Sequence, residues 1–199
     1  MGRLKGTKTL ENLMKAFAGE SQARNRYTFF ASKAKKEGYV QMQEIFLETA
    51  ANEKEHGEMF YKYIVASEAE DGGCVEVNID AGYPVALSDS TYDNLIHAAE
   101  GENEEWAKLY PAFAAIAKLE GFDDIASTFI HVCVAEMAHE TRYRKLAENI
   151  KEGRVFTRVS PTKWKCGNCG YIHEGDSAPQ LCPACKHPQD YFELFVEAY

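Results

Sequence analysis

The sequence predicts a mainly α protein, a four-helix bundle followed by a small metal-bound module of β-strands and turns. Two observations predict this fold class. Four segments repeat apolar residues at steps of three and four, as amphipathic helices do, and each also places acidic residues within its apolar stripe. The C-terminal segment instead carries two Cys-x-x-Cys pairs, Cys166 with Cys169 and Cys182 with Cys185, among glycines and prolines. A chain of 199 residues suits one bundle and one small appendage.

The first two helices are predicted to be antiparallel neighbours. Their inward stripes read Leu13, Phe17, Glu20, Ala23 or Arg24, Tyr27, Ala31 and Ala34 in the first helix, and Met42, Phe46, Thr49, Glu53, His56, Phe60 and Tyr63 in the second. The first helix should end near Gly38, because glycine tolerates the positive φ that often follows a helix. Only a few residues around Gly38 and Tyr39 join the two helices, so they should pack against each other.

The third and fourth helices form a second predicted pair. A long segment from about Ser67 to Ser88 precedes them and can cross over along the bundle. The third stripe reads Leu95, Ala98, Glu102, Glu105, Leu109, Ala112 or Phe113, and Ile116, and the fourth reads Ile125, Phe129, Val132, Glu136, His139, Tyr143, Leu146 and Ile150. Pro111 lies inside the third pattern, lacks an amide donor and should bend that helix. A short connection around Gly121 makes the two helices antiparallel neighbours.

Seven potential metal ligands stand where apolar residues would otherwise continue these stripes. They are Glu20, Glu53 with His56, Glu102 with Glu105, and Glu136 with His139. A carboxylate that faces the core loses its solvation, and Glu and His three residues apart project from the same side of a helix. The alternative is that the acids pair with Lys or Arg across the bundle. Arg24 is the only cation expected near an inner stripe, and one guanidinium cannot neutralise five carboxylates. The pattern therefore predicts buried metal cations.

The composition of the predicted site indicates which metal it binds. Mixed Glu and His ligands on bundle helices suit two iron or manganese ions with bridging carboxylates, whereas zinc needs only four ligands. Five carboxylates leave a net charge of about minus one with two ferrous ions, and the same with two ferric ions and a bridging oxide. A site whose charge balances in both oxidation states is suited to redox cycling.

The four C-terminal cysteines predict a tetrahedral thiolate site for iron or zinc. Two disulfides are the alternative. They are disfavoured because we find no signal peptide and no apolar run that could span a membrane, so we expect a cytoplasmic protein with reduced thiols. Four thiolates alone do not distinguish a zinc ribbon from a one-electron iron centre. A module of about 40 residues buries little core, so its metal should supply much of its folding free energy.

These patterns divide the chain into three parts and exclude one class of partner. We expect the bundle at residues 1–152, a linker at 153–160 and the tetracysteine module at 161–199. The formal net charge of -9 argues against nucleic acid, whose phosphate backbone requires basic partners. That charge is compatible with docking of a basic redox partner, or simply with solubility.

Together these motifs resemble those of rubrerythrins. The resemblance rests on Phe17-Ala-Gly-Glu20-Ser, Glu53-Lys-Glu-His56, Gly101-Glu102-Asn-Glu-Glu105 leading to Tyr110-Pro111, Glu136-Met-Ala-His139, and the terminal cysteine pairs. It covers nearly the whole chain and implies a ferritin-like four-helix bundle with two non-haem iron ions, then a rubredoxin-like module with one iron ion. It also implies a peroxidase of oxidative-stress defence that reduces hydrogen peroxide to water, with reduced rubredoxin or an NADH-dependent reductase as the electron donor.

The resemblance further implies a role for each ligand. Glu53 and Glu136 resemble the bridging carboxylates; Glu20, Glu102 and His139 resemble terminal ligands; Glu105 and His56 resemble the pair that exchange on one iron as its oxidation state changes. Tyr27 and Tyr110 lie near the ligand rows, either as ordinary core aromatics or as phenols hydrogen-bonded to ligating carboxylates. Cys74 and Cys133 fall outside the motifs and are interpreted as incidental thiols, and Trp106, His97 and His131 as packing or surface residues.

Two other functions stay open at this point. One is iron handling, in which the bundle acts as a ferroxidase or storage unit. The other is a binding protein, with a zinc ribbon for docking and structural metals in the bundle. The tail favours the enzyme, because storage does not need a one-electron relay, whereas a peroxidase must be re-reduced.

The length of the linker predicts how the two metal sites are arranged. About nine residues span at most roughly 30 Å, and the segment from Glu136 to Ile150 adds roughly 20 Å along the fourth helix. We therefore expect each tail to lie far from the di-iron site of its own chain. The resemblance implies a homodimer in which each tail docks near the bundle of the partner.

Overall fold

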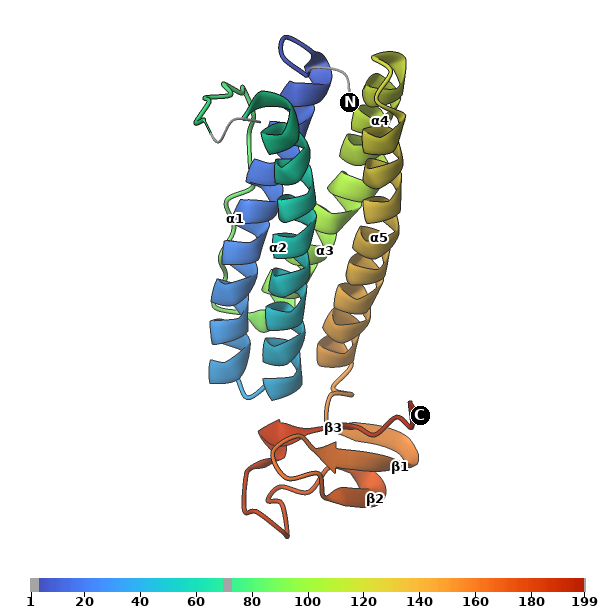
Figure 1. Ribbon diagram of the computed structural model, residues 1–199. Helices are drawn as coiled ribbons and strands as arrows, with labels where there is room; N and C mark the ends of the chain where they lie inside the picture. Colours follow the sequence, from blue (N-terminus) through green and yellow to red (C-terminus); the bar gives the residue numbers. More distant parts are fainter. Residues whose placement is uncertain (1–3, 70–72, 199) are drawn as a thin grey trace.

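Four long helical segments form a bundle, with a small sheet at one end. Figure 1 shows the computed structural model, which describes residues 4–69 and 73–198. The bundle contains α1 (Lys8–Lys36), α2 (Val40–Glu68), α3 (Thr91–Glu104), the π-helical turn η1 (Glu105–Leu109), α4 (Tyr110–Leu119) and α5 (Asp123–Lys151). The C-terminal module contains β1 (Thr157–Cys166), β2 (Ile172–Ser177), the 3-10 turn η2 (Gln189–Tyr191) and β3 (Phe192–Leu194). The predicted fold class is confirmed.

The two short connections use the same turn. Gly38 has a φ of 81° and Gly121 a φ of 85°, in the left-handed region that glycine enters without a Cβ clash. After each glycine, the next amide reaches back into the preceding helix: Tyr39 N–H donates to the carbonyl of Ala34 (2.9 Å), and Phe122 N–H donates in the equivalent way (2.8 Å). This pattern satisfies the last carbonyls of the helix. Both turns reverse the chain, and the predicted antiparallel pairs are confirmed.

The connection between α2 and α3 crosses the length of the bundle. Residues 73–90 contain no helix or strand and run beside α1, so α2 and α3 point in the same direction (Figure 1). Tyr83 ties this segment to α1, because its hydroxyl donates to the carbonyl of Lys15 (2.9 Å). The crossover agrees with the prediction. In the described part of the chain, no helix combines the length and the hydrophobicity that a membrane span requires.

The predicted inner stripe of the third helix is wrong beyond Glu105. Tyr110 N–H donates to the carbonyl of Glu105, five residues back, so the π-helical turn holds one residue more than an α-helical turn. The face that follows is shifted by one residue. Tyr110, Ala114 and Ala117 are buried in place of Leu109, Ala112 or Phe113, and Ile116, and Leu109 is 39% exposed. Pro111 is the second residue of α4, in the first turn after the π-helical turn, where proline is well tolerated.

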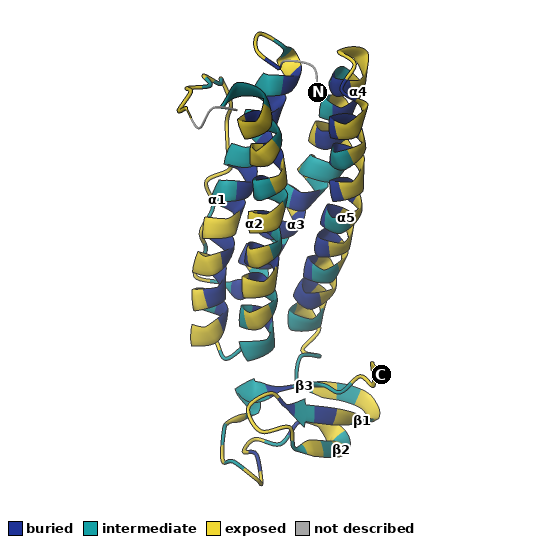
Figure 2. Ribbon diagram, in the orientation of Figure 1, coloured by how far each residue is buried: buried dark blue, intermediate teal, exposed yellow. Residues whose placement is uncertain are grey.

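The apolar core of the bundle is divided into two clusters. One surrounds Phe60 and Phe129, and the other surrounds Phe46 and Tyr143. On each helix, the buried glutamate lies between residues of the first cluster and residues of the second. Figure 2 shows the buried side of the helices facing inward along the bundle. The four acids Glu20, Glu53, Glu102 and Glu136 are at most 1% exposed. A carboxylate layer therefore crosses the middle of an otherwise apolar core.

The C-terminal module is a three-stranded antiparallel sheet in the order β2-β1-β3. Its first strand begins at Thr157, which pairs with Ser177, so residues 157–160 lie in β1 and not in the linker predicted at 153–160. The pairing of β1 with β2 has a register irregularity between Thr157 and Thr162, which interrupts the usual alternation. The module lies beyond the end of the bundle, where the rings of Tyr39 and Phe156 stack with centroids 6.4 Å apart.

Each cysteine pair of the module ends in a residue with positive φ. These are Gly170 (φ 76°), after Cys169, and Lys186 (φ 62°), after Cys185. An L-residue in this region is strained by about 1 kcal/mol relative to glycine. We expect Gly170→Ala to lower the stability of the module by about this amount, and Lys186→Gly to raise it by a similar amount. Thermal unfolding of the metal-loaded protein, followed through the thiolate absorption, measures both. Shifts of the same sign in the two variants would contradict the interpretation.

Candidate metal centres

The bundle brings six of the seven predicted ligands into two overlapping groups. In each group the ligand atoms lie within 4.8 Å of one another: Glu20, Glu53, His56 and Glu136 form one, and Glu53, Glu102, Glu136 and His139 form the other. Glu and His three residues apart supply a pair from α2 and a pair from α5, while α1 and α3 supply one carboxylate each. Glu53 and Glu136 belong to both groups, so the arrangement has the form of two cation positions that share two carboxylates.

The contacts of the shared carboxylates give the same arrangement. His56 Nδ1 lies 2.9 Å from Glu53 Oε2 and 2.8 Å from Glu136 Oε1. His139 Nδ1 lies 2.8 Å from Glu136 Oε2 and 3.3 Å from Glu53 Oε1. Each shared carboxylate therefore directs one oxygen to each histidine. This is the geometry required of a carboxylate that bridges two ions, one beside each imidazole.

The charges of the site require cations. Burial and the neighbouring acids raise the pKa of Glu20 and of Glu102 well above the ordinary value. Burial also opposes ionisation of Glu136, but hydrogen bonds with His139 and His56 outweigh it and lower its pKa to about 2. The same carboxylates raise the pKa of His56 to about 10 and that of His139 to about 12, although burial acts in the opposite direction. The shared carboxylates therefore favour positive charge beside each imidazole, and a metal ion at each position would supply it.

Unsatisfied oxygens provide a second test of whether the residues fit two metal ions. Glu20 Oε2 and Glu102 Oε2 are buried and accept no hydrogen bond from the residues that the structure describes. A buried oxygen without a partner is costly, and two in one layer call for an explanation. Coordination to a cation would satisfy each of them. The donor set, carboxylate oxygens with two imidazoles, is the kind that iron and manganese bind.

Two buried phenols hold the carboxylates that the groups do not share. The hydroxyl of Tyr27 donates to Glu102 Oε1, and that of Tyr110 donates to Glu20 Oε1, and the oxygen–oxygen distance is 2.5 Å in both hydrogen bonds. Both rings are also core aromatics, at 1% exposure. Each tyrosine is therefore a core aromatic whose phenol is also hydrogen-bonded to a candidate ligand.

Removing either phenol should weaken metal binding without emptying the site. Tyr27→Phe and Tyr110→Phe each retain the ring and delete one hydrogen bond to a candidate ligand, and such changes typically lower metal affinity by about 10- to 100-fold. Competition with a chelator, followed through the iron remaining in the bundle, measures the change. Tyr63→Phe is the control, because the Tyr63 hydroxyl contacts Thr128 and no carboxylate. Equal affinities in all three variants would contradict the assigned role.

Glu105, the seventh predicted ligand, lies outside both groups. It begins the π-helical turn, and its Oε1 lies 3.8 Å from the point where a Cβ on Gly19 would stand. Glu105 lines a cleft of about 500 Å³ between α1, the crossover segment and α3, together with Gly19, Arg26 and Tyr83. Burial and the neighbouring acids raise the pKa of Glu105 well above the ordinary value. The structure therefore places this carboxylate beside the metal layer and not within it.

The cation near the inner stripe of α1 was predicted incorrectly. Arg24 is exposed, and Ala23 occupies the inner position. Arg26 is the buried arginine, at 9% exposure, and its guanidinium lies over the ring of Tyr27 (5.8 Å to the centroid). Arg26 directly precedes Tyr27 and was left out of the chosen stripe, although a long side chain can reach the interior from the edge of a helical face.

A buried carboxylate beside the site was also missed. Glu140 follows His139 and is 9% exposed. Its oxygens accept hydrogen bonds from Trp106 Nε1 (2.6 Å), Asn103 Nδ2 (3.1 Å) and Arg144 Nε (2.6 Å). The Glu140–Arg144 spacing of four residues is the signal that could have indicated a paired acid. Trp106, interpreted as a packing or surface residue, in fact joins the π-helical turn to α5.

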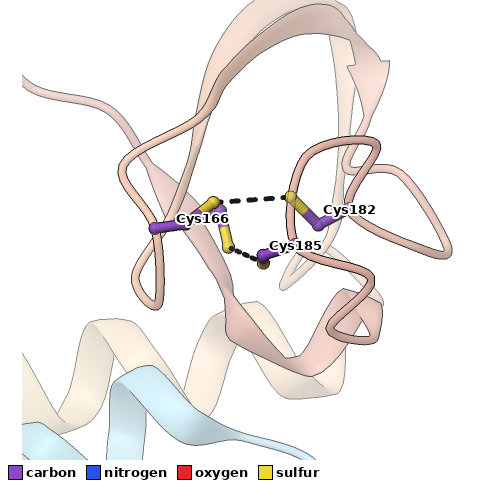
Figure 3. Close-up of side chains that lie close together, drawn as sticks. Cys166, Cys182 and Cys185 are labelled. Carbon is purple, nitrogen blue, oxygen red and sulfur yellow. Dashed lines mark hydrogen bonds between the residues drawn. The ribbon is translucent and has the colours of Figure 1, made fainter.

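The four predicted cysteine ligands converge in the module. Cys166 Sγ lies 3.8 Å from Cys185 Sγ, and Cys169 Sγ lies 3.7 Å from Cys182 Sγ (Figure 3). A tetrahedral metal ion with bonds of about 2.3 Å to sulfur requires sulfurs about 3.8 Å apart, so the spacing fits one ion. Cys182 is buried and Cys169 is exposed, which leaves one edge of the centre at the surface. Cys74 and Cys133 belong to no metal-ligand group within the described ranges.

Both parts of the chain match known families. The family model "Rubrerythrin" matches residues 11–147, and the model "Rubrerythrin, rubredoxin-like domain" matches residues 164–193. The rubrerythrin of Clostridium perfringens is 57% identical over 199 residues and 100% of each chain. The rubrerythrin of Nitratidesulfovibrio vulgaris is 50% identical, over 98% of this chain and 97% of that protein. A solved structure of nigerythrin in a partially reduced state superimposes with a TM-score of 0.63 at 33% identity, covering 98% of this chain and 92% of that one.

Proposed function

Because this chain belongs to the rubrerythrin family, with a di-iron carboxylate site in its bundle and a rubredoxin-like tetracysteine site in its tail, we propose that it is a peroxidase. Hydrogen peroxide takes up two electrons and two protons and gives two molecules of water. When bound, two ferrous ions in the bundle supply both electrons at once, and the tail iron returns electrons singly. The proposal rests on the presence of two redox-capable sites of different kinds in one chain, because iron storage needs only the site in the bundle.

The protein residues position the reaction and connect it to solvent. Glu53 and Glu136 fix the spacing of the two ion positions, and the phenols of Tyr27 and Tyr110 fix the orientation of the other two carboxylates. His56 and His139 line a shallow hollow of about 450 Å³ between α2 and α5, which gives a small oxidant a route to the site. The apolar clusters above and below the layer keep bulk water away from its other sides.

Steady-state turnover under anaerobic conditions tests the proposal. With an NADH-dependent reductase and rubredoxin as the donor system, the protein should consume one NADH for each hydrogen peroxide. His56→Ala should keep the iron of the oxidised site, with Glu105 as the remaining ligand on that ion, but should turn over more slowly. Wild-type rates in His56→Ala would contradict its proposed part in ligand exchange. Oxidation of added ferrous iron with accumulation of a ferric core, and no NADH-linked peroxide consumption, would favour the ferroxidase alternative.

The position of the tail supports transfer of electrons between two chains. The tail contacts its own bundle at the α1–α2 connection, where Asp190 lies opposite Gly38. From Glu136 to the end of α5 at Lys151 is 15 residues, or about 22 Å along the helix axis. Electrons that started from this tail would have to cross that distance to reach the di-iron site of the same chain.

An exposed apolar surface beside the site is suited to a second copy. Ile45, Val134 and Met137 line a hollow of about 620 Å³ between α2 and α5. It continues into the hollow of His56 and His139, because Ala138 and Arg142 line both. We propose a homodimer in which the tail of one chain docks on this face of the other, so that its exposed cysteine edge approaches the partner's di-iron site.

Subunit mixing tests the transfer. A Cys182→Ala, Cys185→Ala double variant lacks the tail centre, and a Glu53→Ala variant lacks the bundle site, so each should be inactive alone. A mixed dimer contains one intact tail and one intact bundle on different chains and should recover part of the donor-dependent peroxidase activity. Recovery should be absent if electrons travel within one chain, provided that subunit exchange is shown independently with labelled protein.

A further inference from the structure

Arg26 and Glu105 lie on neighbouring helical segments that approach each other through two glycines. Arg26 Nη2 lies 3.5 Å from the point where a Cβ on Gly101 would stand, and Glu105 Oε1 lies 3.8 Å from the equivalent point on Gly19. Gly19 and Arg26 are two turns apart on α1, and Gly101 precedes Glu105 by one turn. Each charged side chain therefore covers a glycine of the opposite helix, and the two charges face the same cleft.

The guanidinium of Arg26 is incompletely paired. Its Nε and Nη1 are buried and make no hydrogen bond to any described residue, and none of the described carboxylates forms an ion pair with it. A buried cation without a partner is costly, and a planar guanidinium is shaped to bind a carboxylate through two parallel hydrogen bonds. The position of Arg26 is thus explained if an anionic side chain occupies the space beside it in at least one state of the protein.

Glu105 is the carboxylate that can reach this space. Residues four apart on a helix have Cβ atoms about 5–6 Å apart, and Glu105 is four residues after Gly101. Because the Arg26 guanidinium lies against Gly101, the Cβ of Glu105 is about one helical turn from that guanidinium. The cleft of about 500 Å³ gives the Glu105 side chain room to change rotamer. Glu100 and Glu104 line the same cleft, but both lie toward solvent and neither stands beside the metal layer. Glu105 alone among these acids has the metal layer on one side and Arg26 on the other.

We propose that Arg26 is a positioning residue that holds the Glu105 carboxylate away from the metal ions in one of two alternative positions. In the first position Glu105 turns toward the carboxylate layer, and in the second it pairs with Arg26 in the cleft. Because the two positions compete for one carboxylate, the strength of the pair with Arg26 sets how much negative charge the metal ions experience. The inference depends on metal at the bundle site and not on peroxide being the oxidant, so it can fail separately from the proposed function.

The midpoint potential of the bundle iron tests the inference. Arg26→Gln removes the partner of Glu105, which then stays with the metal ions and favours their ferric state, so the potential should fall. Arg26→Lys keeps the charge and should retain most of the wild-type potential. Arg24→Gln is the matched control: it makes the same change of charge on the same helix at an exposed position, where solvent and salt screen it, and should shift the potential little.

A double-mutant cycle separates this role from a through-space effect of the charge. In a Glu105→Gln background, the potential shift caused by Arg26→Gln should shrink to less than half, because no carboxylate remains to be released. An equal shift in both backgrounds, or no shift in either, would overturn the proposal. If Arg26→Gln does not fold, Arg26→Met fills the same space without unpaired polar atoms and completes the same cycle. Circular dichroism of each variant and its iron content are measured alongside the potential.

Discussion

Replacing either shared carboxylate, by Glu53→Ala or Glu136→Ala, lowers the iron content of the bundle to well below two ions per chain. Each substitution removes a ligand from both cation positions at once, whereas any other substitution in the layer affects one. The remaining acids repel one another and lose the bridge that fixes the spacing of the two ions. Iron analysis of the purified variants, corrected for the one ion of the tail, measures the loss.

Glu55→Ala is the matched control for this loss. Glu55 lies two residues from Glu53 on the same helix, its side chain is 66% exposed, and it contacts Lys54 and no candidate ligand. This variant should retain full iron content. The helical content of all three variants should match the wild type by circular dichroism, because the apolar clusters on both sides of the layer are unchanged. Two bundle ions per chain in both Glu53→Ala and Glu136→Ala would show that the ligands are assigned incorrectly.

Cys182→Ala should abolish iron binding in the tail and unfold the module while the bundle stays folded. The apolar core of the module is one small cluster around Trp164 and Phe192, and Cys182 lies inside it at 0% exposure. A core of this size does not stabilise a domain alone, so the metal–thiolate bonds supply most of the folding free energy. The red absorption of ferric thiolate should vanish, and the amide signals of β1 to β3 should lose their dispersion in NMR spectra.

The bundle provides the internal reference for the loss of the module. Its helical content and its two iron ions should remain in Cys182→Ala, since the contacts between the parts are confined to the end of the bundle. Cys74→Ala removes an exposed thiol that belongs to no metal group and should leave the visible spectrum unchanged. A folded, dispersed module without metal in Cys182→Ala would contradict the assignment of its stability to the metal.

Periodicity predicted the helices and the inward position of the four acids that lie buried in the middle of the bundle. The stripe of α5 is buried from Ile125 to Leu146 as expected, with Glu136 and His139 at its centre, and its last residue, Ile150, is half-buried against the same core. This was possible because a single register of an α-helix fixes which residues face inward over many turns. A carboxylate that repeatedly replaces leucine or phenylalanine in that register is then visible in the sequence.

The structure differs from the prediction where the α-helical period is broken, or where a long side chain reaches from the edge of a helix into its buried face. The π-helical turn at Glu105–Leu109 shifts the face that follows, so Tyr110 was placed correctly only through its nearness to the ligand row. Arg26 reaches the interior from beside the predicted stripe, and Glu140 is buried through partners on another helix. Such placements depend on tertiary contacts between helices, which a helical period does not contain.

Rapid mixing of the fully reduced protein with two equivalents of hydrogen peroxide per chain, without an external donor, tests most directly whether the two metal sites act in series. Absorption at the thiolate band follows the tail, and comparison with Glu53→Ala removes the bundle site. We expect the wild-type tail to be oxidised after the bundle, while the tail of Glu53→Ala stays reduced over the same time. Oxidation of the tail at the same rate in both proteins would show that the tail reacts with peroxide by itself, and would contradict the relay.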